Sequence, residues 1–295
     1  MLGVVNLDKP VGPTSHDMVG MLRRLTGTRR IGHAGTLDPL ASGVLPILVG
    51  PATRFSAELT GGRKRYDAVI RLGARSATDD AEGPIEPVAA PLPDEAAIRH
   101  ALRSFVGSFE QRPPAFSARK AGGRVAHRAA RAGEPIDLPP RTVVIESLEL
   151  LACHRDAESV DVRVDLRCGA GTYVRSLARD LGRALGSGGY LAALRRTEAA
   201  GLSVADAVTP ERLEALAGEG RLSDAFLPVG SLLPLPHVAL DRPGADAFVH
   251  GSPKPFTGPT EGRAAVFEGD RLLGIGVIGG GVLRPEKVLP PEAGA

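Results

Sequence analysis

The chain has 295 residues, 43% of them hydrophobic and 24% charged, which is enough to bury the cores of one large domain and one small one. Its two cysteines form no CxxC pair and its seven histidines form no HExxH pair, which argues against a disulfide scaffold and against a zinc site. An acid interrupts the N-terminal apolar residues and no run approaches the length of a membrane span, so we expect a cytoplasmic protein.

The first 200 residues alternate between helical and strand periodicity, which predicts a mixed α and β domain. In chain order, the expected elements are a helix over 15–25 with Ser15 as its cap, a strand over 65–73, a helix over 93–106, a strand over 160–168 and a helix over 174–185. In the two strands the apolar residues occupy every second position, so we expect one face of each to be buried.

A basic stretch without regular periodicity separates these elements. Between Gln111 and Arg141, seven basic residues stand against two acids: Arg112, Arg119, Lys120, Arg124, Arg128, Arg131 and Arg141 against Glu134 and Asp137. Long irregular loops are usually functional or disordered, and clustered positive charge neutralises phosphates. The stretch therefore predicts a mobile insertion that contacts RNA. The alternative is an arginine-rich solvated surface, which is the commoner explanation for such a cluster alone.

Proline residues over 227–236 mark a break, after which short apolar runs between glycines predict a small β domain without a crossover helix. Gly274, Gly276 and Gly279 have the GxGxxG spacing of a dinucleotide fingerprint, but too few residues follow for the required βαβ unit. We interpret them as turn glycines. No Walker loop is present either, so we expect no cofactor.

The segment that holds the best candidates for catalytic residues is 32–43, GHAGTLDPLASG. Its glycines permit tight turns that present His33 and Asp38 from a loop. Asp38 before Pro39 also has a purely structural explanation, an N-cap followed by proline at the first helical position. His33 alone is more often a structural histidine.

This segment resembles the GHxGxLDPxAxG motif of the bacterial tRNA pseudouridine synthase B (TruB) family, and further blocks follow in family order. They are LDKP at 7–10, KRY at 64–66 with IRLG at 70–73, PPAFSARK at 113–120, GTYVRSL at 171–177 and LRRT at 194–197. The resemblance implies an α+β pseudouridine synthase domain with a mixed, largely antiparallel sheet over residues 1–234, including an RNA-gripping insertion at about 110–141. A PUA-like β-barrel would occupy 235–295.

The resemblance also implies roles for individual residues. Asp38 would be the catalytic carboxylate, and Arg175 would hold it ionised and oriented, as a nearby opposite charge does. Tyr66 would stack on the uracil and serve in the deprotonation of C5, and Tyr173 would line the pocket. The residues expected to bind the RNA substrate are His33, Lys9, Leu194, Lys64, Arg119, Lys120, Arg124 and Arg128. On pattern alone, both tyrosines fit a core and Arg175 fits a helix surface equally well.

The activity implied is the conversion of uridine 55 in the T loop of tRNA to pseudouridine by a monomer that flips the base. Two alternatives remain open at this stage: a guide-RNA-dependent pseudouridine synthase, and a non-catalytic RNA-binding or RNA-folding protein. Departures from the family pattern, such as Ala77 in the SATDD loop and His127 in the insertion, affect RNA docking and leave the expected catalytic set intact.

Overall fold

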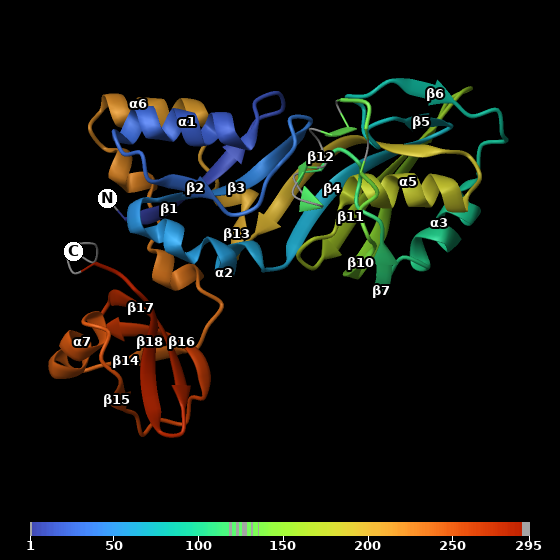
Figure 1. Ribbon diagram of the computed structural model, residues 1–295. Helices are drawn as coiled ribbons and strands as arrows, with labels where there is room; N and C mark the ends of the chain where they lie inside the picture. Colours follow the sequence, from blue (N-terminus) through green and yellow to red (C-terminus); the bar gives the residue numbers. More distant parts are fainter. Residues whose placement is uncertain are drawn as a thin grey trace.

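The computed structural model describes residues 2–117, 120–121, 124–125, 129–130, 132–134 and 136–290, with the backbone alone at 120, 121 and 125. The described chain forms two main sheets, a large one with helices packed against it and a small one within residues 237–290, and two further pairs of short strands (Figure 1). Within these residues, none of the helices combines the length and the apolar character needed to cross a bilayer.

The large sheet is mixed, as expected for an α+β domain. Its strands run in the order β1-β3-β12-β4-β11-β10-β7, with β2 paired to β3 and β13 to β12, and all pairs are antiparallel except β3 with β12. The strands are β1 (Gly3–Lys9), β2 (Ile31–His33), β3 (Ala41–Val49), β4 (Lys64–Leu72), β7 (Gly107–Gln111), β10 (Arg141–Arg155), β11 (Val160–Cys168), β12 (Gly189–Ala199) and β13 (Leu202–Ser203).

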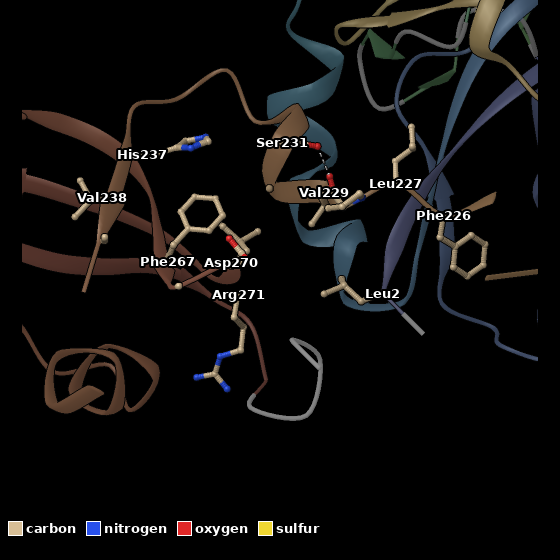
Figure 2. Close-up of a pocket in the computed structure, with 15 residues that line it drawn as sticks. Leu2, Phe226, Leu227, Val229, Ser231, His237, Val238, Phe267, Asp270 and Arg271 are labelled. Carbon is tan, nitrogen blue, oxygen red and sulfur yellow. Dashed lines mark hydrogen bonds between the residues drawn. The ribbon is translucent and has the colours of Figure 1, made fainter. Parts of the chain in front are cut away.

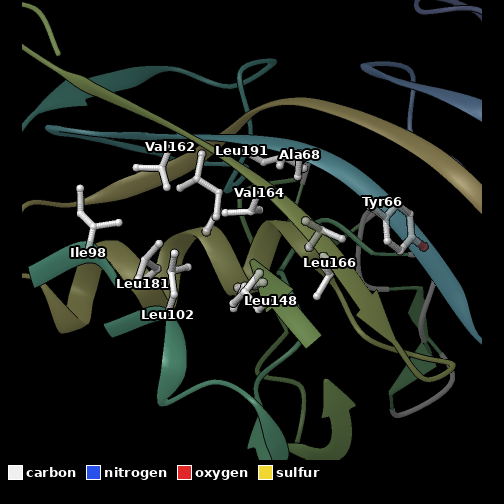
Figure 3. Close-up of a cluster of buried hydrophobic side chains, with 14 of the residues drawn as sticks. Tyr66, Ala68, Ile98, Leu102, Leu148, Val162, Val164, Leu166, Leu181 and Leu191 are labelled. Atoms are coloured by element: carbon white, nitrogen blue, oxygen red, sulfur yellow. The ribbon is translucent and has the colours of Figure 1, made fainter. Parts of the chain in front are cut away.

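The two strands predicted from alternation, β4 and β11, are confirmed and lie side by side at the centre of this sheet. Their apolar face packs against α3 (Glu95–Arg103) and α5 (Val174–Ala184), the two helices predicted nearby. Tyr66 lies at one end of this core, with its hydroxyl turned away from the aliphatic side chains (Figure 3). The alternation of β4 therefore places Tyr66 at the edge of this core.

Helices α1 (Ser15–Thr26) and α6 (Pro210–Gly218) pack over the β1 and β3 end of the sheet. The prediction that Ser15 caps α1 is wrong: Thr14 is the N-cap, and it forms a capping box with Asp17. Ser15 lies inside the helix and is 2% exposed, so its hydroxyl is free for another partner.

The remaining elements connect these layers. They are α2 (Ser56–Thr60), the 3₁₀ helices η1 (Gly50–Phe55), η2 (Val204–Asp206), η3 (Leu222–Ala225) and η4 (Val229–Leu232), and the strand pairs β5 (Ala74–Ser76) with β6 (Ile85–Pro87) and β8 (Lys120–Ala121) with β9 (Arg124–Val125). The last pair lies in the basic insertion, so the expectation of a wholly irregular stretch is wrong. Strands of two residues are too short to show periodicity in a sequence.

The small sheet has the strand order β14-β16-β17-β18-β15. Its elements are β14 (His237–Ala239), α7 (Arg242–Val249), β15 (Lys254–Pro255), β16 (Gly262–Glu268), β17 (Arg271–Gly279) and β18 (Val282–Val288). The expectation of a domain without a crossover helix is wrong, because α7 connects β14 to β16, which are parallel. Asp241 caps this helix and a proline occupies its first turn, a pattern that resembles a loop when read residue by residue.

The glycines of the GxGxxG pattern lie within β17, so their interpretation as turn residues is wrong as well. A Cβ at Gly276 would press on Leu283 and on the Phe248 ring, and one at Gly274 would collide with the Lys287 backbone. Close packing of the small sheet therefore accounts for Gly274 and Gly276, whereas a Cβ at Gly279 would meet open space.

An apolar cluster runs from the large sheet to the small one and contains Val44 and Phe55 together with Val229, Leu272 and Ile275. Beside it, the Glu58 carboxylate, 4% exposed, pairs with Lys287 at 2.7 Å and with Arg263 at 2.6 Å. The two sheets are thus packed against each other, and the division of the chain at 234 and 235 stays a prediction.

Candidate active site

Asp38 lies in the loop between β2 and β3. The residues after Pro39 enter strand β3 instead of a helix, so the interpretation of Asp38 as an N-cap is wrong. Its side chain is 40% exposed, and one face of the carboxylate is therefore open to an incoming molecule.

Two buried side chains and one backbone N–H group hold the backbone on the two sides of Asp38. The Ser15 hydroxyl accepts a hydrogen bond from the Leu37 N–H at 2.8 Å and donates one to the Leu37 carbonyl at 2.9 Å. Arg196, 1% exposed, donates to the Gly35 carbonyl at 2.9 Å, and the Gly12 N–H donates to the Pro39 carbonyl at 2.9 Å. The loop is consequently rigid at the residues that aim the carboxylate.

Arg175 meets this carboxylate from the first turn of α5. Its Nε lies 3.0 Å from Asp38 Oδ2, and its side chain is only 8% exposed. The remaining donors are also occupied, since Nη1 donates to the Thr78 carbonyl at 3.1 Å and Nη2 to the Phe116 carbonyl at 2.9 Å. A guanidinium anchored in this way fixes the direction of the Asp38 carboxylate.

Asp80 is a member of this site that the sequence analysis did not select. Its carboxylate is 2% exposed, lies 3.4 Å from Arg175 Nη1, and accepts hydrogen bonds from the Thr78 hydroxyl at 2.5 Å and the Glu82 N–H at 3.0 Å. Arg175 thus stands between a buried acid and a half-exposed one. In the sequence, Asp80 is marked only as one of the acids of the SATDD loop. Its burial in the structure distinguishes it from its neighbours.

Tyr66 and Arg196 are buried side chains next to the Asp38 loop. Burial raises the pKa of the Tyr66 hydroxyl above its ordinary value, and the nearby Arg196 guanidinium opposes this shift by charge and by a hydrogen bond. Tyr66 is therefore a neutral phenol near pH 7. Arg196 belongs to the LRRT block, but the sequence assigned it no role.

Three basic residues predicted to bind RNA lie around the same loop, each half-buried or fully buried. Burial lowers the pKa of Lys9 to about 8; its Nζ is inaccessible and donates to the Pro10 carbonyl at 2.7 Å. Burial likewise lowers the pKa of Lys64 to about 8, and its Nζ donates to the Thr60 and Gly62 carbonyls. His33 is half-buried, burial lowers its pKa, and among the described residues its buried Nδ1 has no hydrogen-bond partner.

Leu194 and Tyr173 complete the surroundings. Leu194 is half-buried on β12 between the two cores of the large domain, and it pairs with Ala41 at the start of β3. Tyr173 is half-buried at the N-cap of α5, two residues before Arg175. The fold thus pairs Asp38 with Arg175 and places Tyr66 and Leu194 on the adjacent strands β4 and β12, although the four residues are far apart in the sequence.

Comparison with known proteins identifies the family of this chain. The model described as TruB family pseudouridylate synthase (N terminal domain) matches residues 23–174. Models described as tRNA pseudouridylate synthase B C-terminal domain and Pseudouridine synthase II TruB, C-terminal, match residues 175–234 and 236–289. The chain belongs to the TruB family.

Relatives and a solved structure support this membership over the whole chain. A tRNA pseudouridine synthase B of Ralstonia nicotianae is 42% identical over 97% of this chain and 94% of its own length. One of Burkholderia mallei is 43% identical over 97% and 96%. A solved chain from a Cbf5-Nop10-Gar1 complex is 28% identical, covers 98% of this chain and 86% of its own, and superposes with a TM-score of 0.74. The predicted pseudouridine synthase fold is confirmed.

The basic insertion of this TruB family member is described only in part. Arg124 is exposed and pairs with Glu134 at 2.7 Å, so its charge is balanced in the free protein. Arg119 and Arg128, and the side chain of Lys120, lie outside the described residues. Their assignment to RNA binding stays a prediction.

A cavity of about 680 Å³ in this structure lies away from the catalytic set. It opens where the segment Phe226–Ser231 faces the small sheet, with His237 and Phe267 on one side and Leu2 and Leu227 on the other (Figure 2). None of the predicted catalytic residues lines it. Within the predicted catalytic set, the Asp38 side chain is 40% exposed, whereas Tyr66 and Arg175 are buried.

Proposed function

We propose that this chain converts a uridine of tRNA to pseudouridine, and that the target is uridine 55 in the T loop. The observation that carries the proposal is the Asp38–Arg175 ion pair, half open to solvent and adjacent to Tyr66, in a chain of the TruB family. Relatives with 42–43% identity over nearly the whole length bear the name tRNA pseudouridine synthase B, which supports tRNA as the substrate.

The reaction breaks the bond between N1 of uracil and C1′ of ribose, turns the base, and joins C5 to C1′; the proton leaves C5 and N1 gains one. Atoms and electrons balance without an oxidant or a cofactor. Cleavage of a glycosidic bond leaves positive charge on the sugar, which a carboxylate stabilises or captures. Attack on the sugar, attack on the uracil and assistance to elimination all need an ionised Asp38 at the open face.

The target base must leave its stack to reach this carboxylate, which costs a few kcal/mol. Tyr66 and Leu194 offer an aromatic and an aliphatic surface for the extruded uracil, and Tyr173 borders the same space. Stacking on such surfaces recovers about 1–3 kcal/mol per base. Arg175 does not need to contact the RNA, because its donors are occupied by the protein.

Asp38→Asn tests the chemistry. This variant keeps the size of the side chain and should bind tRNA with nearly unchanged affinity while forming no pseudouridine. Appreciable turnover by Asp38→Asn refutes the assignment. If the protein is a non-catalytic RNA-binding module, the wild type also fails to modify tRNA and the variant keeps every cellular phenotype.

A second experiment addresses the guide-RNA-dependent alternative, which the likeness to a Cbf5 complex keeps in view. Pure protein is incubated with a bare T-arm transcript, without guide RNA or partner proteins. Pseudouridine formed there supports a stand-alone enzyme; modification that needs an added guide refutes it. We further propose that the enzyme acts as a monomer in the cytoplasm, which light scattering and cell fractionation test.

A further inference from the structure

The first residues of the basic insertion are tied to the helix that carries Arg175. Gln111 is the last residue of edge strand β7 and is fully buried. Its side-chain amide binds both backbone groups of Tyr173: Nε2 donates to the carbonyl at 3.1 Å, and Oε1 accepts from the N–H at 2.9 Å. Both ends of the amide are used, so its orientation is fixed.

This contact acts at the N-cap of α5. Tyr173 forms no side-chain capping bond, and its carbonyl also accepts the first helical hydrogen bond, from the Leu177 N–H at 3.1 Å. Gln111 therefore binds, from outside the helix, the backbone N–H of the N-cap residue, which a Glu or Gln at the third helical position binds in a capping box. Arg175, two residues further on, follows any shift of this first turn.

Two further hydrogen bonds join the same segment to α5. The Arg112 carbonyl accepts from Arg179 Nη2 at 2.9 Å, and the Phe116 carbonyl accepts from Arg175 Nη2 at 2.9 Å. Arg175 and Arg179 are one helical turn apart and face the segment together. The guanidinium that orients Asp38 is thus bonded directly to the backbone of the insertion.

The other end of the insertion reaches the same turn. Arg141, the first residue of β10, pairs with Gln111 across the sheet. Its guanidinium covers Gly171, where the backbone has φ of +85° and a Cβ would collide with it. Both ends of the insertion consequently pack against residues 171–173, just before α5.

We propose that Gln111 is a positioning residue for the Arg175–Asp38 pair, and that it acts by fixing the first turn of α5, from which Arg175 reaches Asp38. The inference rests on the proposed function.

Gln111→Glu tests this with a change of nearly equal volume. The introduced carboxylate still accepts from the Tyr173 N–H but faces the Tyr173 carbonyl with an acceptor in place of a donor. The control is the reverse substitution at the preceding residue, Glu110→Gln, where the exposed carboxylate accepts a hydrogen bond from the Thr142 hydroxyl. Binding of T-arm RNA and the single-turnover release of tritium from C5 of uridine are measured for both.

We expect Gln111→Glu to slow the single-turnover rate about tenfold, while the dissociation constant of the RNA stays within about twofold. Glu110→Gln should match the wild type in both. Equal rates for Gln111→Glu and the wild type overturn the inference. So does a loss of affinity with an unchanged rate, because the contact would then serve RNA binding alone.

A double-mutant cycle separates action through Arg175 from a general structural effect. In an Arg175→Lys background, followed over hours with excess enzyme, Gln111→Glu should slow the reaction less than about twofold, because the two changes disturb one arrangement. The full tenfold loss in that background overturns the proposal. If the Gln111→Glu protein does not fold, the Arg179→Lys variant is measured in its place. A wild-type rate for Arg179→Lys then also overturns the proposal. A wild type that releases no tritium refutes the proposed function instead.

Discussion

Ser15 gives the sharpest test of how the Asp38 loop is held, because it and Thr14 are neighbours with different partners. Ser15→Ala removes the hydroxyl that binds both backbone groups of Leu37, the residue before Asp38. Leu37 is 3% exposed, so its N–H and carbonyl lose their partner in a buried place. Each such loss costs about 1–3 kcal/mol, which for the two groups predicts a decrease of about 2–6 kcal/mol in the free energy of unfolding.

The same substitution should also slow catalysis, because the loop that aims the carboxylate gains freedom. Thr14→Ala is the matched control: it removes the cap of α1 and costs about 1 kcal/mol, but it does not touch Leu37. Urea unfolding and single-turnover tritium release are compared for both variants at 20 °C, where about 5–15 kcal/mol of wild-type stability keeps them folded. A Ser15→Ala protein with wild-type rate and stability, or equal slowing by Thr14→Ala, refutes the reasoning.

Three other predictions concern charge. Arg175→Ala should lower turnover by at least about tenfold through the loss of the Asp38 ion pair, and an unchanged rate and pH–rate profile would remove Arg175 from the site. Burial lowers the pKa of Lys9 from 10.5 to about 8, so between these values the unfolded chain binds the proton that the folded chain has released, and stability rises with pH. Lys9→Met should remove about 1.4 kcal/mol per pH unit of that rise in urea titrations at pH 8 and 10, and an identical slope contradicts the shift. Joint neutralisation of Arg124 and Arg128 should flatten the slope of log affinity for tRNA against log salt by about 1–2, and an unmoved slope means that the insertion is no phosphate clamp.

Much of the candidate site was accessible from the sequence because its signals are local. Tyr66 is placed by the alternation of its strand, and Arg175 by the turn that opens α5. The ordered family blocks then selected these residues from many equivalent ones. The sequence did not reveal the residues that these side chains and the Asp38 loop contact. No motif marks these partners as such: Asp80, Arg196, Ser15 and Gln111.

The errors have the same origin. Ser15 looked like a cap because its neighbours were considered along the chain, whereas its hydroxyl faces a loop 22 residues away. The helix α7 was missed because proline and glycine in its first turn resemble a loop, yet the small sheet needs a crossover there.

By itself the sequence determined the class of the fold, the central strands and the identity of the chemical groups, since periodicity and turn residues act between near neighbours. The tertiary structure alone decided which groups are buried, which are paired and which remain open. The order of strands in the sheet decides whether Lys9 is exposed or buried. It also decides whether Asp38 caps a helix or pairs with Arg175. That order arises from contacts between distant segments, which no local pattern encodes.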